Sequence, residues 1–339
     1  MKLLTVVVPC YNSAAYMDKA IDSLLVGGDE LDILIVDDGS KDDTAAIADR
    51  YAAAHPSRVR VIHQPNGGHG SGINRCIETA QGIYMKVVDS DDRLDADGLR
   101  LLLDTLRQHT EPAEQVDLIV HDYVYDTTDK QATYRMSYRT CIPGNRVLGW
   151  ADCHHFGIAF QFMIHSLVYR VELLRANGLT LPEHTFYKDN IYIYKPLPWV
   201  KKLIYLPRPV YGYNIGRADQ SVNEANMVKR LDQLAAMLTR MATSWTLAEL
   251  NAQPRPLRGY MLHNAIAQIL NLRMLVCLAD TPENNALLDK LWADIRDFDE
   301  PLYKKLRNCW VGRVTRFHTR PGKRILIIAY RIGRRIVHF

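Results

Sequence analysis

Two carboxylates one residue apart follow an apolar segment of the chain. Asp89 and Asp91 belong to the run Asp89-Ser90-Asp91-Asp92, which comes directly after the apolar residues 83–88. Carboxylate oxygens are preferred ligands of Mg²⁺ and Mn²⁺, and such an ion often also binds phosphate oxygens. The spacing therefore predicts a divalent cation site that holds a diphosphate.

A second acidic pair, Asp37 and Asp38, precedes Gly39 and Ser40 and closes another apolar segment, residues 33–36. Open α/β sheets bind ligands outside the carboxyl ends of their strands. Two acidic loops that each end a predicted strand therefore indicate a nucleotide site at the rim of a parallel sheet.

The elements that must position these loops alternate between strand and helix over the first 110 residues. Ser40 and Asp43 resemble a capping box that starts the second helix. Apolar runs and helical spacing predict strands over 3–8, 31–36, 59–63 and 83–89, and helices over 14–25, up to 54 and up to 80. This order predicts an α/β fold with a doubly wound, mostly parallel sheet. A glycine-rich loop, residues 66–72, is expected to frame the nucleotide pocket.

The later part of the chain changes from mixed to purely helical patterns. A helix is expected over 98–107 and a short one over 172–177, with strands over 116–123, 166–170, 203–206 and 210–214. Helices are expected over 228–243, 257–278 and 282–296. We therefore predict a catalytic domain over 1–222, a helical region over 223–300 and a basic tail over 301–339.

Charge is distributed unevenly along the 339 residues. The chain has a net charge of +4, yet residues after 300 contain 11 Lys and Arg and no Asp or Glu. At helical spacing the tail forms an apolar stripe beside a basic one, and an earlier segment repeats this pattern around Tyr303, Leu306, Trp310, Val314 and Phe317. The apolar stripe consists of Ile325, Ile328, Ala329, Ile332, Ile336 and Phe339. A cationic amphipathic helix is typical of binding to an anionic membrane surface. The alternative is packing on the body or on a second copy, so a homo-oligomer stays open.

Six scattered cysteines show no metal-type spacing, which indicates a reducing compartment. The short apolar run at the N-terminus fits a first strand better than a signal peptide. The chain contains no window of about 20 apolar residues, so we expect no transmembrane helix. We expect a cytoplasmic protein, peripheral at the inner face of the cell membrane. The histidines are expected at the surface or in an acceptor cleft. Lys86 is a candidate phosphate contact, although a surface lysine is the favoured interpretation.

Three motifs in this order and spacing resemble the family-2 glycosyltransferases, which have the GT-A fold. They are Val7-Val8-Pro9-Cys10-Tyr11-Asn12, Val36-Asp37-Asp38-Gly39-Ser40 and Val88-Asp89-Ser90-Asp91-Asp92. The resemblance implies a metal-dependent, inverting transfer of a sugar from a nucleoside diphosphate, most simply UDP, to a hydroxyl of a glycan or lipid-linked glycan. It also implies a setting in bacterial exopolysaccharide, capsule or cell-wall polymer synthesis.

The resemblance also implies roles for single residues. Asp38 would bind the uracil edge, Asp91 would bind the metal ion, and Asp89 would bind the ion or the ribose. Ile73 and Cys76 depart from the family pattern around Asn74. The full nucleotide-binding set is Pro9, Tyr11, Asn12, Asp38, Asn74, Asp89, Ser90 and Arg217. Arg217 belongs to a loop that would close over the diphosphate and that also contains Gln220 and Ser221.

On the acceptor side, Asp189 matches the family's catalytic base, although Lys188 replaces the usual Glu. A carboxylate there would take the hydroxyl proton as the acceptor oxygen attacks the sugar. The alternative is that Asp189 caps the helix that carries Tyr192 and Tyr194. Asp92 and Asp95 are expected to form an exposed turn that caps the helix after Leu94.

Three other functions compete with this interpretation. A polyprenyl-phosphate sugar transferase would need no base, because its acceptor is already an anion. A nucleotidyltransferase would need a basic phosphate-binding signature near the N-terminus, which the chain lacks. A nucleic-acid-binding protein would explain the basic tail and leave the acidic loops unexplained, so no nucleic acid is expected as a partner.

Overall fold

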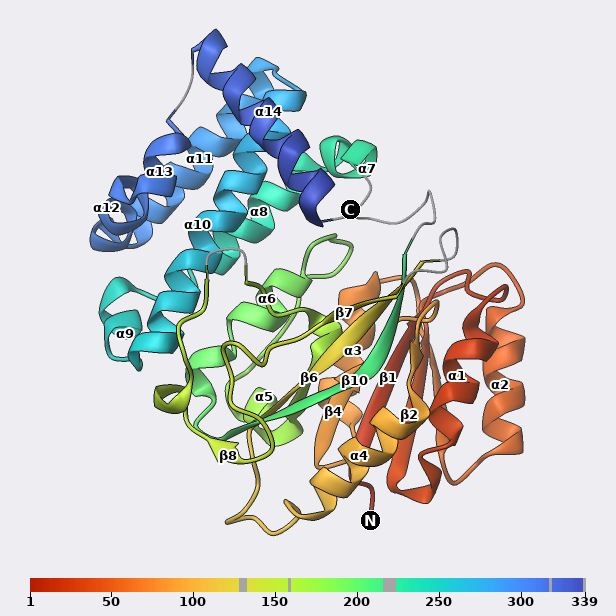
Figure 1. Ribbon diagram of the computed structural model, residues 1–339. Helices are drawn as coiled ribbons and strands as arrows, with labels where there is room; N and C mark the ends of the chain where they lie inside the picture. Colours follow the sequence, from red (N-terminus) through yellow and green to blue (C-terminus); the bar gives the residue numbers. More distant parts are fainter. Residues whose placement is uncertain (128–132, 158–159, 216–223, 317–318, 338–339) are drawn as a thin grey trace. The chain divides into compact units, whose positions relative to one another are not determined.

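The computed structural model describes residues 1–127, 133–157, 160–215, 224–316 and 319–337 (Figure 1). The chain forms two compact units. The first comprises Met1–His154 and Phe162–Gly216, and the second comprises His155–Gln161 and Arg217–Phe339. Each unit has its own buried apolar core, so each is described by itself.

The first unit is built on one mixed sheet with the strand order β3-β2-β1-β4-β9-β6-β10-β5. Neighbouring strands are parallel from β3 to β4 and again between β6 and β10, whereas β9 is antiparallel to both of its neighbours. Short strands β7 and β8 pair with β6 and β10. The strands are β1 Leu4–Cys10, β2 Leu31–Asp37, β3 Val59–His63, β4 Tyr84–Val87, β5 Arg93–Leu94, β6 Leu118–Thr127, β7 Thr133–Met136, β8 Val147–Leu148, β9 Leu167–Arg170 and β10 Leu203–Ile215.

The central strands are apolar because helices cover both faces of the sheet. Every residue of β1 and β2 is buried, as expected for parallel strands in an α/β fold. The two late strands predicted over 203–206 and 210–214 are one long strand, β10. Its pairing with β6 shifts register between Leu206 and Tyr211, around Pro207 and Pro209. Proline cannot donate to the ladder, so the prolines mark an irregularity and not an end.

Connecting helices follow the predicted order. Helices α1 and α4 contact each other, and α1 is tied to α2 by an ion pair between Asp18 and Arg50 (3.0 Å). Helix α3 contacts β1, β4 and α5. The helices of this unit are α1 Met17–Leu25, η1 Gly28–Glu30, α2 Thr44–Ala54, α3 His69–Thr79, α4 Ala96–Arg107, η2 Trp150–Asp152, η3 Ile164–Ser166, α5 Val171–Ala176, α6 Asp189–Tyr194 and η4 Leu197–Trp199.

The predicted capping box at Ser40 and Asp43 does not form. Asp43 is the N-cap of α2 but makes no capping hydrogen bond with its side chain. Ser40 Oγ instead accepts a hydrogen bond from the N–H of Asn12 (3.0 Å). Ser40 therefore joins the loops after β1 and β2 and does not start the helix.

The second unit is helical and centred on α10, which contacts α7, α8, α9, α11, α12, α13 and α14. By length and composition α10 could cross a membrane, but 56% of its apolar window is buried inside the protein. That burial is typical of a core helix. The helices are α7 Glu224–Lys229, α8 Leu231–Ala242, α9 Leu247–Asn251, α10 Arg255–Leu278, α11 Pro282–Phe298, α12 Glu300–Asn308, α13 Trp310–Val314 and α14 Arg320–Val337.

The segment before the last helix differs from its prediction. Its residues do not form one exposed amphipathic helix, because α12 ends at Asn308 and α13 begins at Trp310. Leu306 is buried, and only Trp310 among the described members of this stripe is a strongly exposed aromatic residue, at 71%. This stripe is therefore only partly covered, because Tyr303 and Val314 are of intermediate exposure.

Candidate active site

Strand ends bring the predicted loops together at one rim of the sheet. The parallel register places Pro9 level with Val36 and Cys10 level with Asp37. The loop after β1 also reaches the loop after β4, because Ser13 Oγ lies 2.9 Å from Ser90 Oγ. The prediction that these motifs adjoin one another is consistent with this geometry, although the role of each residue stays a prediction.

Asp38 is buried, and its carboxylate holds the glycine-rich loop. Oδ1 accepts hydrogen bonds from the N–H of Gly67 (2.8 Å) and from Gln64 Nε2 (2.7 Å). Oδ2 accepts one from the N–H of Gly68 (2.7 Å), which has a positive φ of 82°. A carboxylate has about four acceptor positions, so a uracil edge would have to compete with these donors. Because Oδ1 accepts from Gln64, Gly67 and Ser71, whereas Oδ2 accepts from the N–H of Gly68, the predicted contact with the base would use Oδ2.

The loop after β1 presents one exposed ring. Asn12 has a left-handed backbone conformation with φ 50°, and its Oδ1 accepts a hydrogen bond from the N–H of Lys41 (2.9 Å). Pro9 is buried against Gly72 of α3, whereas Tyr11 is 49% exposed. Of the three predicted nucleoside contacts, Pro9 is therefore covered, whereas Tyr11 and Asn12 are both exposed to solvent, where a base can reach them.

Asp89 is the partly exposed acid at the end of β4. Its Oδ1 lies 2.7 Å from Nε2 of His69, and its N–H donates to the hydroxyl of Tyr211 (3.2 Å). Burial by itself would raise the pKa of Asp89, but the charge and hydrogen bond of His69 and the charge of Lys188 lower it to about 2. Asp89 is therefore ionised at neutral pH, as a metal or ribose ligand must be.

The carboxylates of Asp89 and Asp91 fit a divalent cation only together with ligands from another molecule. Among the described residues, no group of three or more His, Cys, Asp or Glu side chains is placed to hold a metal ion. Mg²⁺ is commonly bound by one or two carboxylates together with substrate phosphates. This donor set therefore suits an ion that binds with a diphosphate, not a permanently bound one.

The prediction of an exposed capping turn is wrong for Asp92. Asp95 does cap α4, with Oδ1 accepting from the N–H of Gly98 (2.8 Å). Asp92 is only 1% exposed, and its carboxyl group accepts hydrogen bonds from the Tyr211 hydroxyl and from the N–H of Asn214 (2.7 Å). Burial and the charge of Asp89 raise the pKa of Asp92 to about 9. Asp92 therefore anchors β10 to the loop after β4, which contains Asp89 and Asp91.

Lys86 was expected at the surface but is completely buried. Its Nζ donates to the carbonyl oxygen of His165 (2.6 Å) and lies 2.7 Å from Nε2 of His121. His121 Nδ1 lies 2.8 Å from the carbonyl oxygen of Asp122, which assigns the proton to Nδ1 and leaves Nε2 to accept from Lys86. Burial lowers the pKa of Lys86 well below its usual value.

An aromatic cluster lies beside this lysine at the carboxyl ends of β6 and β10. The ring of His165 stacks on Tyr211 with centroids 4.8 Å apart and meets the edge of Tyr123 at 4.2 Å. Tyr213 lies tilted over His165 at 4.9 Å. Sequence reasoning missed this cluster and wrongly expected His121 and His165 at the surface or in a cleft. The alternation of Tyr123 with Tyr125 and of Tyr211 with Tyr213 was the available signal, because it puts these rings on one face of adjacent strands.

The acceptor-side segment packs against the glycine-rich loop. The N–H of His184 donates to the carbonyl oxygen of Gly67 (2.7 Å), and a Cβ on Gly68 would lie 3.0 Å from that same nitrogen. Asn74 exchanges two hydrogen bonds of 2.9 Å with the backbone of Leu181. Asn74 therefore holds this segment, and a direct nucleotide contact by its amide stays a prediction.

Asp189 begins α6 without capping it. The N-cap position is Lys188, and no side-chain capping bond forms there. Among the described residues Asp189 Oδ1 accepts no hydrogen bond, and it lies 3.3 Å from Lys188 Nζ in an ion pair. The capping alternative is therefore wrong. Because the charge of Lys188 also acts on Asp89, the lysine links the two acids electrostatically.

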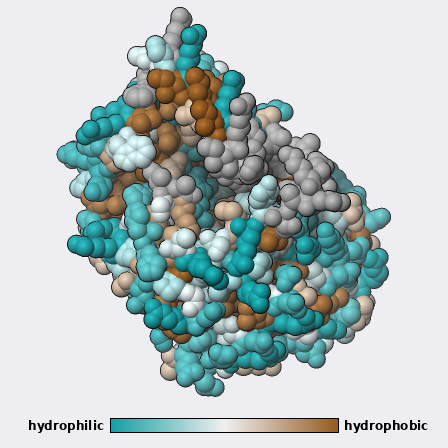
Figure 2. Space-filling model, viewed as in Figure 1, coloured by the Kyte–Doolittle hydropathy of each residue, from teal (hydrophilic) through white to brown (hydrophobic). Residues whose placement is uncertain are grey.

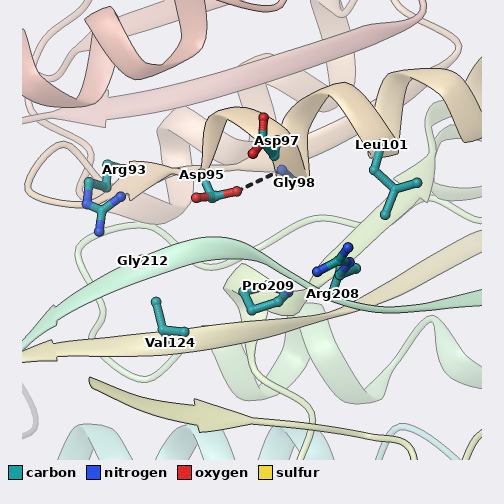
Figure 3. Close-up of a pocket in the computed structure, with 9 residues that line it drawn as sticks. All are labelled: Arg93, Asp95, Asp97, Gly98, Leu101, Val124, Arg208, Pro209 and Gly212. Atoms are coloured by element: carbon teal, nitrogen blue, oxygen red, sulfur yellow. Dashed lines mark hydrogen bonds between the residues drawn. The ribbon is translucent and has the colours of Figure 1, made fainter. Parts of the chain in front are cut away.

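Two features lie outside this site. Arg217, Gln220 and Ser221 fall outside the described residues. A cavity of about 410 Å³ lies between α4 and β10, as Figure 3 shows. Its lining contains no residue of the predicted nucleotide, metal or catalytic set: Arg93, Asp95, Asp97, Gly98, Leu101, Val124, Arg208, Pro209 and Gly212.

Comparison with known proteins agrees with this fold. Residues 5–167, which contain both acidic loops, match the model of glycosyl transferase family 2. This segment, slightly less than half of the chain, is therefore similar to that family.

Curated relatives share part of the chain. It is 31% identical over 199 residues to the uncharacterized glycosyltransferase EpsJ of Bacillus subtilis, covering 56% of this chain and 54% of that protein. It is 39% identical over 107 residues to a chondroitin synthase of Escherichia coli, covering 31% of this chain and 16% of that protein. The chain thus spans about half or less of the length of these relatives.

Solved structures share the fold over almost the whole chain. S. aureus TarS 1-349 in complex with UDP-GlcNAc aligns with a TM-score of 0.67 and 18% identity, covering 98% of this chain and 92% of that one. The mannosyltransferase PcManGT from Pyrobaculum calidifontis, in complex with GDP-Man and Mn²⁺, aligns with a TM-score of 0.54 and 17% identity, covering 96% and 86%. The predicted GT-A-type α/β fold with a C-terminal helical extension is thereby confirmed.

Proposed function

We propose that the chain is an inverting glycosyltransferase that moves a sugar from a UDP-sugar to a hydroxyl of a glycan. The observation that carries the proposal is that Lys188, which pairs with Asp189 (3.3 Å), also acts by its charge on Asp89 just after β4. This arrangement offers acids for a diphosphate-bound cation on one side and a proton acceptor on the other. The UDP-GlcNAc complex of TarS and the chondroitin synthase relative support a UDP-sugar donor and a glycan acceptor.

Asp89 and Asp91 would hold Mg²⁺ or Mn²⁺ with the diphosphate, and the ion would offset the negative charge that develops on the leaving nucleotide. The Mn²⁺ complex of PcManGT supports this assignment. Tyr11 would contact the base, while Asp38 keeps the glycine-rich loop in place. Arg217 would add a donor to the phosphates.

Asp189 would accept the proton of the acceptor hydroxyl as that oxygen attacks the sugar. Its side chain is 39% exposed, while Oδ1 is buried in the ion pair with Lys188, so the acceptor hydroxyl would reach the carboxylate at Oδ2. A carboxylate is a weak base, so proton transfer would accompany bond formation.

The proposed setting is polysaccharide assembly at the inner face of the cell membrane. A growing or lipid-linked glycan is then the acceptor, and the enzyme works as a cytoplasmic, peripheral protein. The polysaccharide synthase relative supports the acceptor class.

The proposal is tested by a donor screen with UDP-, GDP- and dTDP-sugars, scored by released nucleotide with Mn²⁺ and with EDTA. We expect release from a UDP-sugar that EDTA abolishes. Asp91→Asn and Asp189→Asn should each lower the rate by about 10²–10⁴-fold, whereas the exposed control Asp97→Asn should not. Full activity of Asp189→Asn would favour an anionic, polyprenyl-phosphate acceptor, and no release from any donor would refute the proposal.

A further inference from the structure

The last helix, α14, has three different sides. Gly322 and Leu326 are buried, and α14 contacts α10. Lys323 extends this inner side with an ion pair to Asp280 (2.6 Å). The helix is therefore docked on its own unit through a side that does not include the predicted apolar stripe.

The apolar stripe of α14 faces outward instead. Ile325 is 58% exposed, Ile328 57% and Ile332 53%, and the neighbouring Ala329 is also exposed. These residues follow the spacing i, i+3, i+4 and i+7, so they form one continuous face. Figure 2 shows hydrophobic side chains gathered near the top of the view, where Figure 1 places α14, with hydrophilic side chains beside them. The described residues of this stripe are therefore not covered by the helices of their own unit, and packing on the body or on a second copy stays the alternative to membrane binding.

A row of arginines borders the exposed stripe. Arg324 and Arg331 are exposed and lie two helical turns apart, on the side of the stripe away from Leu326. They belong to a tail that contains 11 Lys and Arg and no acidic residue after position 300. Soluble surface helices rarely expose three isoleucines on one continuous face. A partner for this face must therefore be apolar at its centre and anionic at its border.

We propose that this face of α14 binds the surface of an anionic lipid bilayer. Ile325, Ile328 and Ile332 would enter the boundary between headgroups and acyl chains, while Arg324 and Arg331 contact the anionic headgroups. A bilayer matches both halves of the face at once. The inference rests on the membrane setting of the proposed function and deepens it by naming the surface that binds lipid. Lipid binding needs neither donor nor metal, so it and the sugar transfer can fail separately.

The test is sedimentation of the full chain with vesicles of phosphatidylcholine containing 30% phosphatidylglycerol, compared with pure phosphatidylcholine. We expect binding to the anionic vesicles alone, and at least tenfold weaker binding for the triple variant Ile325→Ser, Ile328→Ser, Ile332→Ser. Arg324→Gln with Arg331→Gln should weaken binding several-fold and reduce its dependence on salt. Val26→Ser, which changes a 47% exposed valine on the other unit, is the matched control.

Thermal unfolding and nucleotide release from soluble donor should stay unchanged in these variants, because the altered side chains are exposed and far in sequence from the site. Equal vesicle binding by the wild type and the triple variant would overturn the proposal. So would a dimer of the wild type in sedimentation velocity that the triple variant abolishes, because a second copy would then cover the stripe. Binding to a polynucleotide with no binding to vesicles would also overturn it.

Discussion

Asp89 and Asp92 lie three residues apart, yet their pKa values shift in opposite directions. Asp89 meets His69 and feels Lys188, so its pKa falls to about 2. Asp92 is buried between the loop after β4 and β10, near the negative charges of Asp89 and Asp91, so its pKa rises to about 9. Asp89 is thus ionised and can bind ligands, whereas Asp92 is neutral and holds β10 to the loop after β4.

The neutral Asp92 predicts a specific pH dependence of stability. The unfolded pKa is near 3.8 and the folded pKa is about 9, so the folded chain holds one more proton between these values. Its contribution is present at low pH and is lost as the pH rises towards 9, by at most about 1.4 kcal/mol per pH unit. Asp92→Asn keeps the neutral form and should flatten this dependence. Urea unfolding in EDTA without nucleotide, from pH 5 to 9, measures it; parallel curves for both proteins would contradict it.

Removing the buried amine of Lys86 should destabilise the first unit. Lys86→Met leaves the carbonyl oxygen of His165 and Nε2 of His121 without their donor, and a buried unsatisfied acceptor costs about 1–3 kcal/mol. The exposed control Lys290→Met should change the free energy of unfolding by less than about 0.5 kcal/mol. Equal stability of Lys86→Met and wild type in urea would show that the amine does not hold this cluster.

The two acidic loops could be predicted because each is a short motif that directly follows a predicted strand, so its recognition needs no knowledge of distant contacts. The surroundings of Lys86 were not, since a lysine on an apolar strand is ordinarily at an edge or surface. Its partners His121 and His165 come from elements 35 and 79 residues away. Asn74 shows the same limit, because its bond to Leu181 spans 107 residues.

At the scale of elements, the alternation of strands and helices up to α4 predicted the parallel half of the sheet. Antiparallel β9 and the long β10 were harder, because their partners come from distant parts of the chain. Prolines 207 and 209 looked like a break between two strands. In the structure β6 continues to pair across them with a shifted register.

Close contact between α4 and β10 predicts opposite effects for two glycines. A Cβ on Gly98 would lie 2.3 Å from the carbonyl oxygen of Pro209, so Gly98→Ala should lower the free energy of unfolding by about 1–3 kcal/mol. Gly259, inside α10, has nothing within 4 Å of the added Cβ, so Gly259→Ala should raise it by about 0.5–1 kcal/mol. Chemical denaturation of both variants measures this pair of effects, and destabilisation by both would show that helix packing is tighter than described.

At the scale of the whole molecule, the acidic residues proposed for catalysis and the basic residues proposed for lipid binding belong to different units. The carboxylates of the candidate site belong to the first unit, whereas the acid-free basic segment belongs to the second. A cation is needed where the diphosphate binds, and positive charge is useful where anionic lipid binds. This division explains why a net charge of +4 alone indicated little about partners.

Donor binding should therefore protect one unit selectively from hydrogen exchange. UDP with Mn²⁺ binds the folded site and not the unfolded chain, so it should slow exchange in residues 9–13, 66–72 and 89–92. Exchange in α10 and α11 should stay unchanged, because their amides are held by the separate core of the second unit. The measurement is exchange followed by mass spectrometry, with UDP plus EDTA and GDP plus Mn²⁺ as controls. Equal protection by GDP would show that the base is not selected by Asp38 and Tyr11. Protection confined to α10 and α11 would place the nucleotide away from the aspartates.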